Sequence, residues 1–418
     1  MRPRARRQSK SGVIGRLMSF VGRGSSPDYI LAIATAGLVV IGLMAVYSAT
    51  FDWSYQDYGS SAYVFWLHVR WTLVGILFLA VITVIPYDLW QKAALPLMGI
   101  ALLLLILVLL LGQEKYGAIR SFSEGSIQPS EFAKLAVVVY IATWLASKGD
   151  QIRDFTYGLV PFSILVGVVA GLIVLQPDMS AAALIVLSAI AMFFFAGADL
   201  FRLSGGGVVA AFTLFVLVNR VGYAKDRITE HLRTRHDPSL IGYHLRQSLI
   251  ALGTGGLLGV GPGRGLQKLG YLPAAHTDSI FAVVGEEAGL LGCLLVLGLF
   301  ALLTYRGFRI ATEAPDAFGA ILACGLTCTI VFQALANVAV VIGLIPFTGV
   351  ALPFVSFGGS SMIVSLVGVG ILLSISRGRR VAKRSEQNTR YRAGLDRGRR
   401  DGGTRLPGAG HRTGASRG

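Results

Sequence analysis

The segment "LPAAHTDSIFAVVGEEAGLLGCLLVLGLFALLTY" (residues 272–305) joins a polar stretch to a long apolar run. The apolar part, residues 281–305, exceeds the roughly 20 helical residues that are needed to cross the hydrocarbon core of a bilayer. Similar runs recur along most of the 418-residue chain, which is 54% hydrophobic and only 14% charged. This composition lies far from that of a soluble domain and predicts an all-α, polytopic membrane protein with about ten transmembrane helices.

The apolar runs also predict where the helices lie. The expected spans are residues 29–50, 64–86, 93–111, 129–147, 156–175, 180–198, 203–220, 281–305, 317–343 and 359–376. Residues 51–63 then form a first outer loop, and residues 221–280 form a large extracytoplasmic loop between the seventh and eighth spans. A connection of that length in a compact protein is more often functional than idle.

The net charge of +16 is concentrated at the two ends of the chain. Residues 1–27 carry seven basic side chains and no acid, and residues 377–418 carry thirteen basic and three acidic ones. Because excess Lys and Arg mark cytoplasmic segments, we predict basic cytoplasmic tails at both ends, the C-terminal one disordered, around a ten-helix domain at residues 28–376. Nucleic-acid binding is the other interpretation of such tails, but a topology signal with attraction to anionic lipid is favoured, and no nucleic-acid partner is expected.

Asp278 stands where the large loop meets the eighth span, a costly position for a charge. Three interpretations of this carboxylate are open: a general base, a cation ligand, or the N-cap of the following helix, a role that Thr277 could share. Glu286 and Glu287 lie roughly 12 Å deeper if the helix is continuous. Carboxylates at that depth need a cavity or a cationic partner, and the basic residues of the loop are the available partners.

Three further stretches combine polar residues with helix ends or broken backbone. "IQPSEFAKL" (127–135) and "LQPDMS" (175–180) carry Glu131, Lys134 and Asp178, for which helix capping at Ser130 and lysine snorkelling are the structural alternatives. "GVGPGRGLQK" (259–268) can hold phosphate or form a plain turn. "IPFTGVALPFVSFGGSS" (345–361) is too rich in Pro and Gly for a continuous helix and predicts either a cavity lining or an outer loop.

Taken together, these motifs resemble the SEDS family (FtsW/RodA type). The resemblance rests on "LQKLGYLPAAHTDSIFAVVGEEAGLLG", "VIGLIPFTGVALPFVSFGGSS", "QPSEFAKL", "QPD" and "YHLRQSLIALGTGG", and it runs from about residue 29 to 376. The "GEE" form of the main motif is similar to the division branch rather than the elongation branch, where "LAEE" is usual.

The resemblance implies an inverting peptidoglycan glycosyltransferase that polymerises lipid II on the outer face of the cytoplasmic membrane. It implies Asp278 as the catalytic residue, a class B penicillin-binding protein and other division or elongation proteins as partners, and lipid II and nascent lipid-linked glycan as ligands. A divalent cation, Mg²⁺ or Mn²⁺, held by Asp278 is conceivable, and no organic cofactor is expected. The residues expected to contact substrate are Lys134, Arg246, Gln247, Arg264, Gln267, Lys268, His276, Thr277, Glu286, Glu287, Gln333, Asn337, Ser356, Gly358, Gly359 and Ser360.

The chain departs from the family pattern at a few positions. Ala274 stands where the family often has Glu, and Ser121 where it usually has Trp. Ser180, Ser279 and Phe357 replace Gly, Phe and Tyr. Asp278 itself is retained. The alternatives to a polymerase are a lipid II flippase, which broken helices and buried charges also suit, and a silent scaffold for the division complex.

Overall fold

The computed structural model describes residues 26–111, 113–115, 118–121, 128–149, 152, 154, 158–198, 229 and 241–378. Its helices are α2 (Tyr29–Tyr58), α3 (Tyr63–Val84), α4 (Asp88–Leu111), α5 (Pro129–Lys148), α6 (Val160–Val174), α7 (Met179–Phe195), α10 (Tyr243–Gly255), α11 (Ile280–Thr312), α12 (Ala317–Val341) and a last membrane helix, Gly359–Gly378. Two short antiparallel strands, β1 (Gln113–Lys115) and β2 (Ala118–Ser121), form a hairpin that the sequence did not predict.

The helices account for nine of the ten predicted spans. Seven of them are long and apolar enough to cross a membrane, and α6 and α7 are shorter apolar helices within the same bundle. The predicted span at residues 203–220, both basic tails and most of residues 221–240 lie outside the described residues. The protein is therefore a multi-pass helical membrane protein, while the count of ten spans stays a prediction.

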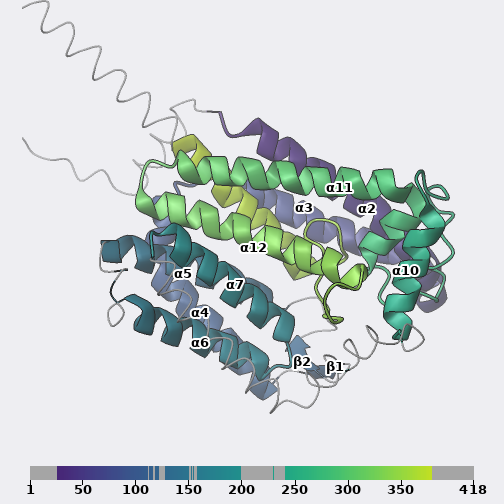
Figure 1. Cartoon of the computed structure of the whole chain (residues 1–418), viewed down its shortest axis with the longest axis horizontal. Coiled ribbons are helices and arrows are strands. Elements are labelled where there is room, and N and C mark those ends of the chain that lie inside the picture. The colour runs from purple at the N-terminus through teal and green to yellow at the C-terminus, as the bar shows by residue number, and fades with distance from the viewer. Residues whose placement is uncertain are drawn as a thin grey trace, which may run out of the picture.

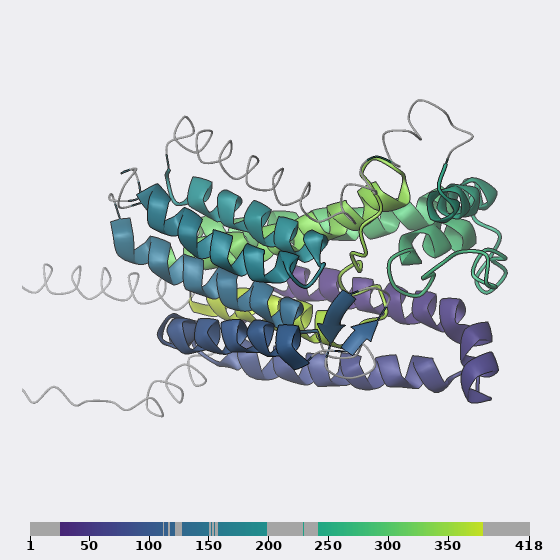
Figure 2. The same ribbon diagram turned by 90° about the horizontal axis from the view of Figure 1, so that it is seen from below.

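The long helices run side by side, and α10 lies across one end of the bundle (Figure 1). Helix α11 packs against α2, α12 and α10, whereas α5 packs against α4, α7 and α12. Figure 2 shows the β1–β2 hairpin toward the same end of the bundle as α10. We call this end, where α11 starts and α12 finishes, the α10 end.

Aspartates start three of the helices. Asp28 accepts a hydrogen bond from Leu31 N at 3.1 Å, Asp178 from Ala181 N at 3.1 Å, and Asp316 from Gly319 N at 2.9 Å. Each carboxylate satisfies one of the N–H groups that a helix leaves without a partner at its first turn. The helix starts are thus set by local sequence.

Two helices end later than predicted. Both continue through polar residues beyond the apolar run from which the span was predicted. Helix α2 runs on to Tyr58 and stops at Gly59, whose φ of 70° is left-handed, so Asp52 and Asp57 are helical rather than in a loop. Helix α11 reaches Thr312, so Arg306, which follows the predicted span at residues 281–305, is helical as well. Arg306 is buried and its Nε donates to Asp28 Oδ2 at 3.1 Å.

Helix α11 is interrupted near its first third. Gly289 has φ 65° and ψ −163°, a conformation outside the helical region. The turn at residues 256–261 takes over the backbone hydrogen bonds there: Val260 N and Gly261 N donate to the carbonyls of Glu286 and Glu287, and Leu290 N donates to that of Gly256. A break at this depth is stable because a neighbouring loop satisfies the freed backbone groups.

Candidate functional site

Asp278 lines a polar cavity of about 170 Å³ at the α10 end of the bundle. We call this cavity the Asp278 pocket. Its walls come from the starts of α5 and α7, from α12, and from the segment between α12 and the last helix. Lys134, Thr277, Gln333, Gly358, Gly359 and Ser360, all predicted from the sequence to contact substrate, line it as well.

The backbone around Asp278 is fixed by hydrogen bonds from α12 and from the segment that follows it. Asn337 Nδ2 donates to the carbonyl of Asp278 at 2.7 Å, and Ser356 Oγ donates to that of Thr277 at 2.6 Å. Phe357 N donates to the carbonyl of His276 at 2.8 Å. The broken stretch at residues 345–361 is thus a cavity lining, as one interpretation of the sequence predicted.

Helix capping does not explain Asp278. The N-cap of α11 is Ser279, and the side chain of Ser279 makes no capping hydrogen bond. The Asp278 carboxylate instead points toward Gly349, where an added Cβ would lie 3.1 Å from Asp278 Oδ2. Because glycine has no side chain, Gly349 leaves room for the Asp278 carboxylate.

Lys134 supplies a positive charge to the Asp278 pocket. Its side chain is buried, and Nζ donates to Glu131 Oε1 at 2.8 Å and to Gln333 Oε1 at 2.7 Å. Gln333 Nε2 in turn donates to the carbonyl of Ala351 at 2.9 Å. The alternative in which Lys134 snorkels to the interface is wrong, because its ammonium is held inside the bundle by these partners.

Asp178, which the sequence placed only at a span end, is also a residue of the Asp278 pocket. Its carboxylate caps α7 and also accepts hydrogen bonds from Gln128 Nε2 at 3.0 Å, Ser130 Oγ at 3.2 Å and Ser180 Oγ at 3.0 Å. Ser130 therefore donates its hydroxyl hydrogen bond to Asp178. It is not the cap of α5, whose N-cap residue is Gln128. The repeated Gln-Pro at residues 128–129 and 176–177 was the available signal for this contact.

His276 stacks on Trp53 of α2, with ring centroids 4.6 Å apart and an interplanar angle of 14°. Phe357 packs edge-on against the same imidazole at 5.8 Å. Burial lowers the pKa of His276 from 6.5 to about 4, so the ring is neutral near pH 7. His276 thus acts as an aromatic support beside Asp278 and joins α2 to the site.

The structure does not bring every predicted loop residue to Asp278. Arg246 and Arg264 are exposed, and neither they nor Gln247 and Gln267 line the Asp278 pocket. That Arg246, Arg264 and Lys268 contact the substrate stays a prediction. Lys134, from a different part of the sequence, is the basic residue in the wall of this pocket.

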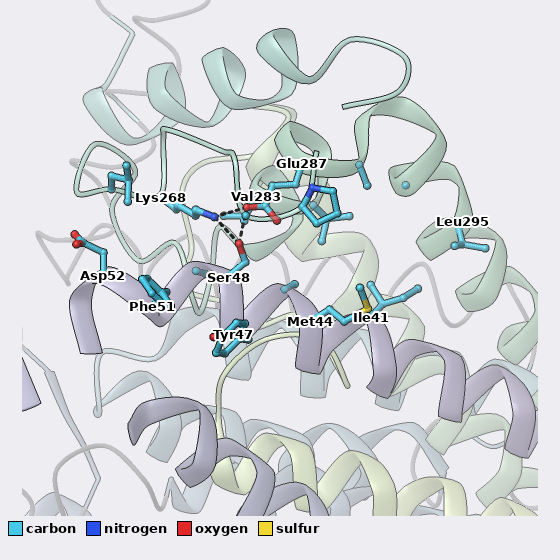
Figure 3. A pocket seen from close by; sticks show the side chains of 18 residues that line it. Ile41, Met44, Tyr47, Ser48, Phe51, Asp52, Lys268, Val283, Glu287 and Leu295 are labelled. Atoms are coloured by element: carbon cyan, nitrogen blue, oxygen red, sulfur yellow. Dashed lines mark hydrogen bonds and ion pairs between the residues drawn. The ribbon is translucent and has the colours of Figure 1, made fainter. Parts of the chain in front are cut away.

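Glu286 and Glu287 hold the loop against α11 and do not enter the Asp278 pocket. Glu286 Oε1 accepts hydrogen bonds from Leu266 N at 2.8 Å and Gln267 N at 3.2 Å. Glu287 Oε1 pairs with Lys268 Nζ at 2.5 Å, and Lys268 also donates to Ser48 Oγ (Figure 3). The prediction that a basic loop residue compensates these glutamates is confirmed for Glu287.

No group of three or more His, Cys, Asp or Glu side chains suited to a metal ion occurs among the described residues. Of the carboxylates near Asp278, Glu131 is paired with Lys134 and Asp178 is bonded to hydroxyl, amide and backbone donors. The side chains in this part of the chain therefore do not form a cation cage.

The fold and the site are those of a polytopic helical membrane protein that holds a carboxylate and an ammonium in one polar pocket near an end of the helix bundle. Comparison with known families identifies the family to which the protein belongs. Residues 29–381 match the family model FtsW/RodA/SpoVE, described as "Cell cycle protein". The chain belongs to this family, which confirms the resemblance seen in the sequence.

Relatives agree over nearly their whole length. A protein of Trichlorobacter lovleyi named "Probable peptidoglycan glycosyltransferase FtsW" is 40% identical over 85% of this chain and 94% of its own. Stage V sporulation protein E of Bacillus subtilis is 39% identical over 84% of this chain and 98% of its own.

Solved structures show the same fold. A chain of a peptidoglycan synthase complex that coordinates polymerization and crosslinking has a TM-score of 0.70 at 28% identity, covering 84% of this chain and 98% of its own. The rod shape determining protein RodA of Thermus thermophilus has a TM-score of 0.63 at 28% identity, covering 84% and 97%.

Proposed function

We propose that this chain is a peptidoglycan glycosyltransferase of cell division, which joins lipid II units into glycan strands with Asp278 as general base. The observation that carries the proposal is the Asp278 pocket, where a carboxylate and the Lys134 ammonium line one cavity in an apolar bundle. The names of the FtsW relatives, which describe them as probable peptidoglycan glycosyltransferases, support it. Lipid-linked substrates also explain why polar catalytic groups adjoin membrane helices.

The reaction needs one base and one stabiliser of negative charge. The 4-hydroxyl of the acceptor sugar attacks the anomeric carbon of the donor, and its proton passes to Asp278. The bond from that carbon to the diphosphate oxygen breaks in the same displacement, so the configuration inverts and polyprenyl diphosphate leaves with the electron pair. Lys134, already aligned by Glu131 and Gln333, is placed to offset the developing charge without rearrangement.

The direction of the chain in the membrane follows from its charge. Basic tails on the cytoplasmic side put the α10 end, with the Asp278 pocket, on the outer face of the cytoplasmic membrane. The span at residues 203–220 would bring the total to ten and leave both termini inside. Labelling of a cysteine introduced at position 410 from outside intact cells would contradict this topology.

The assignment to division rather than elongation is supported by the relatives named FtsW. A class B penicillin-binding protein is the proposed partner, and the synthase complex whose chain shares this fold supports it. A divalent cation bridging Asp278 and the substrate diphosphate stays a hypothesis. The rate of EDTA-treated enzyme with and without added Mg²⁺ decides it.

The direct test incubates the purified full-length chain, alone and with its transpeptidase partner, on fluorescent lipid II and separates the products by gel electrophoresis. A ladder of glycan strands is the expected result. Folded protein that yields no strands in either preparation, yet moves lipid II between the leaflets of proteoliposomes, would establish the flippase instead. Inactivity in both assays would establish the scaffold.

A further inference from the structure

A second and larger cavity lies between α2 and α11, with a volume of about 850 Å³. We call it the α2–α11 groove. It follows α2 from Asp52 to Ile41, which is about 17 Å of helix at 1.5 Å per residue. Its volume lies in the range of roughly 300–1,000 Å³ that is usual for ligand sites. Figure 3 shows Ile41, Met44 and Tyr47 along one wall and Leu295 at the far end.

The groove exists because small side chains face one another across it. Ala45 and Ala49 of α2 and Ala288 and Gly292 of α11 are among its lining residues. Small residues on facing membrane helices usually let the two backbones pack closely. Here the helix break at Gly289 and the loop at residues 262–269 lie alongside the groove, and open space remains between the helices.

Lys268 and Glu287 neutralise each other in the polar part of the groove, and Asp52 at its outer end accepts a hydrogen bond from Gln56 Nε2 at 2.7 Å. The Lys268 ammonium is bound by the Glu287 carboxylate and by Ser48 Oγ, each at 2.5 Å, and both charged side chains are about nine-tenths buried. The remaining wall is mainly hydrocarbon, and both helices are long enough to span the membrane. An occupant that matches this wall is an uncharged apolar chain that enters from the bilayer.

The outer end of the groove adjoins the Asp278 site through α2. Asp52 lines the groove, and the next residue, Trp53, stacks on His276, two residues before Asp278. On α11, Val283 and Val284 line the groove less than two turns after Asp278. The Trp53–His276 stack therefore links the outer end of the groove to the segment that carries Asp278.

The reaction also requires such a site. It joins two substrates that each carry a long hydrocarbon chain, whereas the Asp278 pocket holds only about 170 Å³ and has a largely polar lining. We propose that the α2–α11 groove binds the polyprenyl chain of one lipid-linked substrate, whose saccharide reaches over Trp53 and His276 to Asp278. This inference rests on the proposed function, because it takes the substrate class from it.

Photo-crosslinking tests occupancy. A diazirine amino acid replaces Leu295 or Met44, which are 57% and 62% exposed at the groove, or Leu77 of α3, which is 64% exposed away from it. The full-length proteins, together with the transpeptidase partner, are placed in phospholipid nanodiscs with fluorescent lipid II. We expect labelled lipid at positions 295 and 44, displaced by excess polyprenyl diphosphate, and little at position 77. Equal labelling at all three positions, or a crosslink from position 295 to the transpeptidase partner instead of lipid, overturns the proposal.

Filling the groove tests its role in turnover. Leu295→Trp with Met44→Trp should raise the KM for lipid II about tenfold, equivalent to about 1.4 kcal/mol of binding free energy, and leave kcat within a factor of about two. Leu77→Trp, equally large and equally exposed, should leave KM unchanged. An unchanged KM in a folded, groove-filled variant overturns the proposal.

The same crosslink in an Asp278→Asn background separates this inference from the proposed function. Labelled lipid without glycan synthesis is the expected result, because binding in the groove does not need the base. Full glycan synthesis by Asp278→Asn overturns the mechanism and leaves the groove intact, whereas an active wild-type enzyme without the crosslink overturns only the groove.

Discussion

Asn337 of α12 holds the backbone of Asp278: its Nδ2 donates to the Asp278 carbonyl at 2.7 Å and to the Val350 carbonyl at 2.7 Å. One amide thus ties the segment before α11 to the broken segment after α12. Both segments contribute walls to the Asp278 pocket. The structure shows Asn337 as a positioning residue, and its predicted contact with substrate stays a prediction.

Asn337→Asp should be more damaging than Asn337→Ala. Alanine removes two hydrogen bonds and leaves two carbonyls less well satisfied, at a cost of about 1–3 kcal/mol. Aspartate sets an acceptor-only carboxylate against the same two carbonyls. We expect kcat to fall in both variants with little change in KM, and the melting temperature to fall further for Asn337→Asp. Equal melting of Asn337→Asp and wild type would contradict the assigned bonds.

Variants of the Lys134–Glu131 ion pair should distinguish the contribution of Lys134 to stability from its contribution to catalysis. Removing one partner of a buried ion pair leaves an uncompensated charge and costs roughly 3–5 kcal/mol. Glu131→Gln or Lys134→Met alone should therefore lower the melting temperature, and the double variant should recover most of it. Because Lys134 is the proposed stabiliser of the leaving diphosphate, the double variant should stay inactive on lipid II. Recovery of activity together with stability would limit Lys134 to a structural role.

Gly349 is expected to tolerate no side chain next to Asp278. An alanine Cβ would stand 3.1 Å from Asp278 Oδ2, closer than ordinary van der Waals contact. Gly349→Ala should displace the carboxylate and reduce kcat by roughly tenfold, about 1.4 kcal/mol in activation free energy. Gly298→Ala is the matched control, since nothing lies within 4 Å of a Cβ there. Wild-type kcat for folded Gly349→Ala would show that the carboxylate does not need that space.

His276 should make the protein less stable in mild acid. Its pKa is about 4 in the folded protein and 6.5 as the ordinary value, so the unfolded chain binds the extra proton first as the pH falls. From this group, the free energy of unfolding falls by about 2 kcal/mol as the pH drops from 7 to 5, and it does not change above pH 7. His276→Gln should show a smaller drop in melting temperature over that interval. An identical drop in both proteins would mean that the imidazole is not buried in neutral form.

Apolar runs predicted the membrane helices well because span length is a local property. The span predicted at residues 129–147 corresponds to the helix Pro129–Lys148, and the span predicted at 317–343 corresponds to Ala317–Val341. Polar helical ends were missed, since Asp52 and Asp57 in α2 resemble loop residues when only hydropathy is considered. The break at Gly289 was equally invisible, because it depends on hydrogen bonds from a turn some thirty residues earlier.

The site was predicted in part. Asp278 and the glycines at 358 and 359 were found through motifs that lie on the pocket wall. Arg246 and Arg264 were chosen because they are in the same loop as Asp278, but closeness in sequence did not place them in the pocket. Asp178 was noted but not assigned to the site, because capping is a sufficient local explanation for an acid at a helix start. Its hydrogen bonds to Gln128 and Ser130 appear only in three dimensions.

The most direct measurement is glycan-strand synthesis from fluorescent lipid II by purified Asp278→Asn, beside wild type and a Glu313→Gln control at the opposite end of α11. Asparagine keeps the shape of the side chain but cannot accept the proton, and general-base catalysis contributes about 10²–10⁴-fold. We expect a loss of that size for Asp278→Asn with an unchanged melting temperature, and near-normal strands for Glu313→Gln. Strands of wild-type length and rate from folded Asp278→Asn would contradict this expectation.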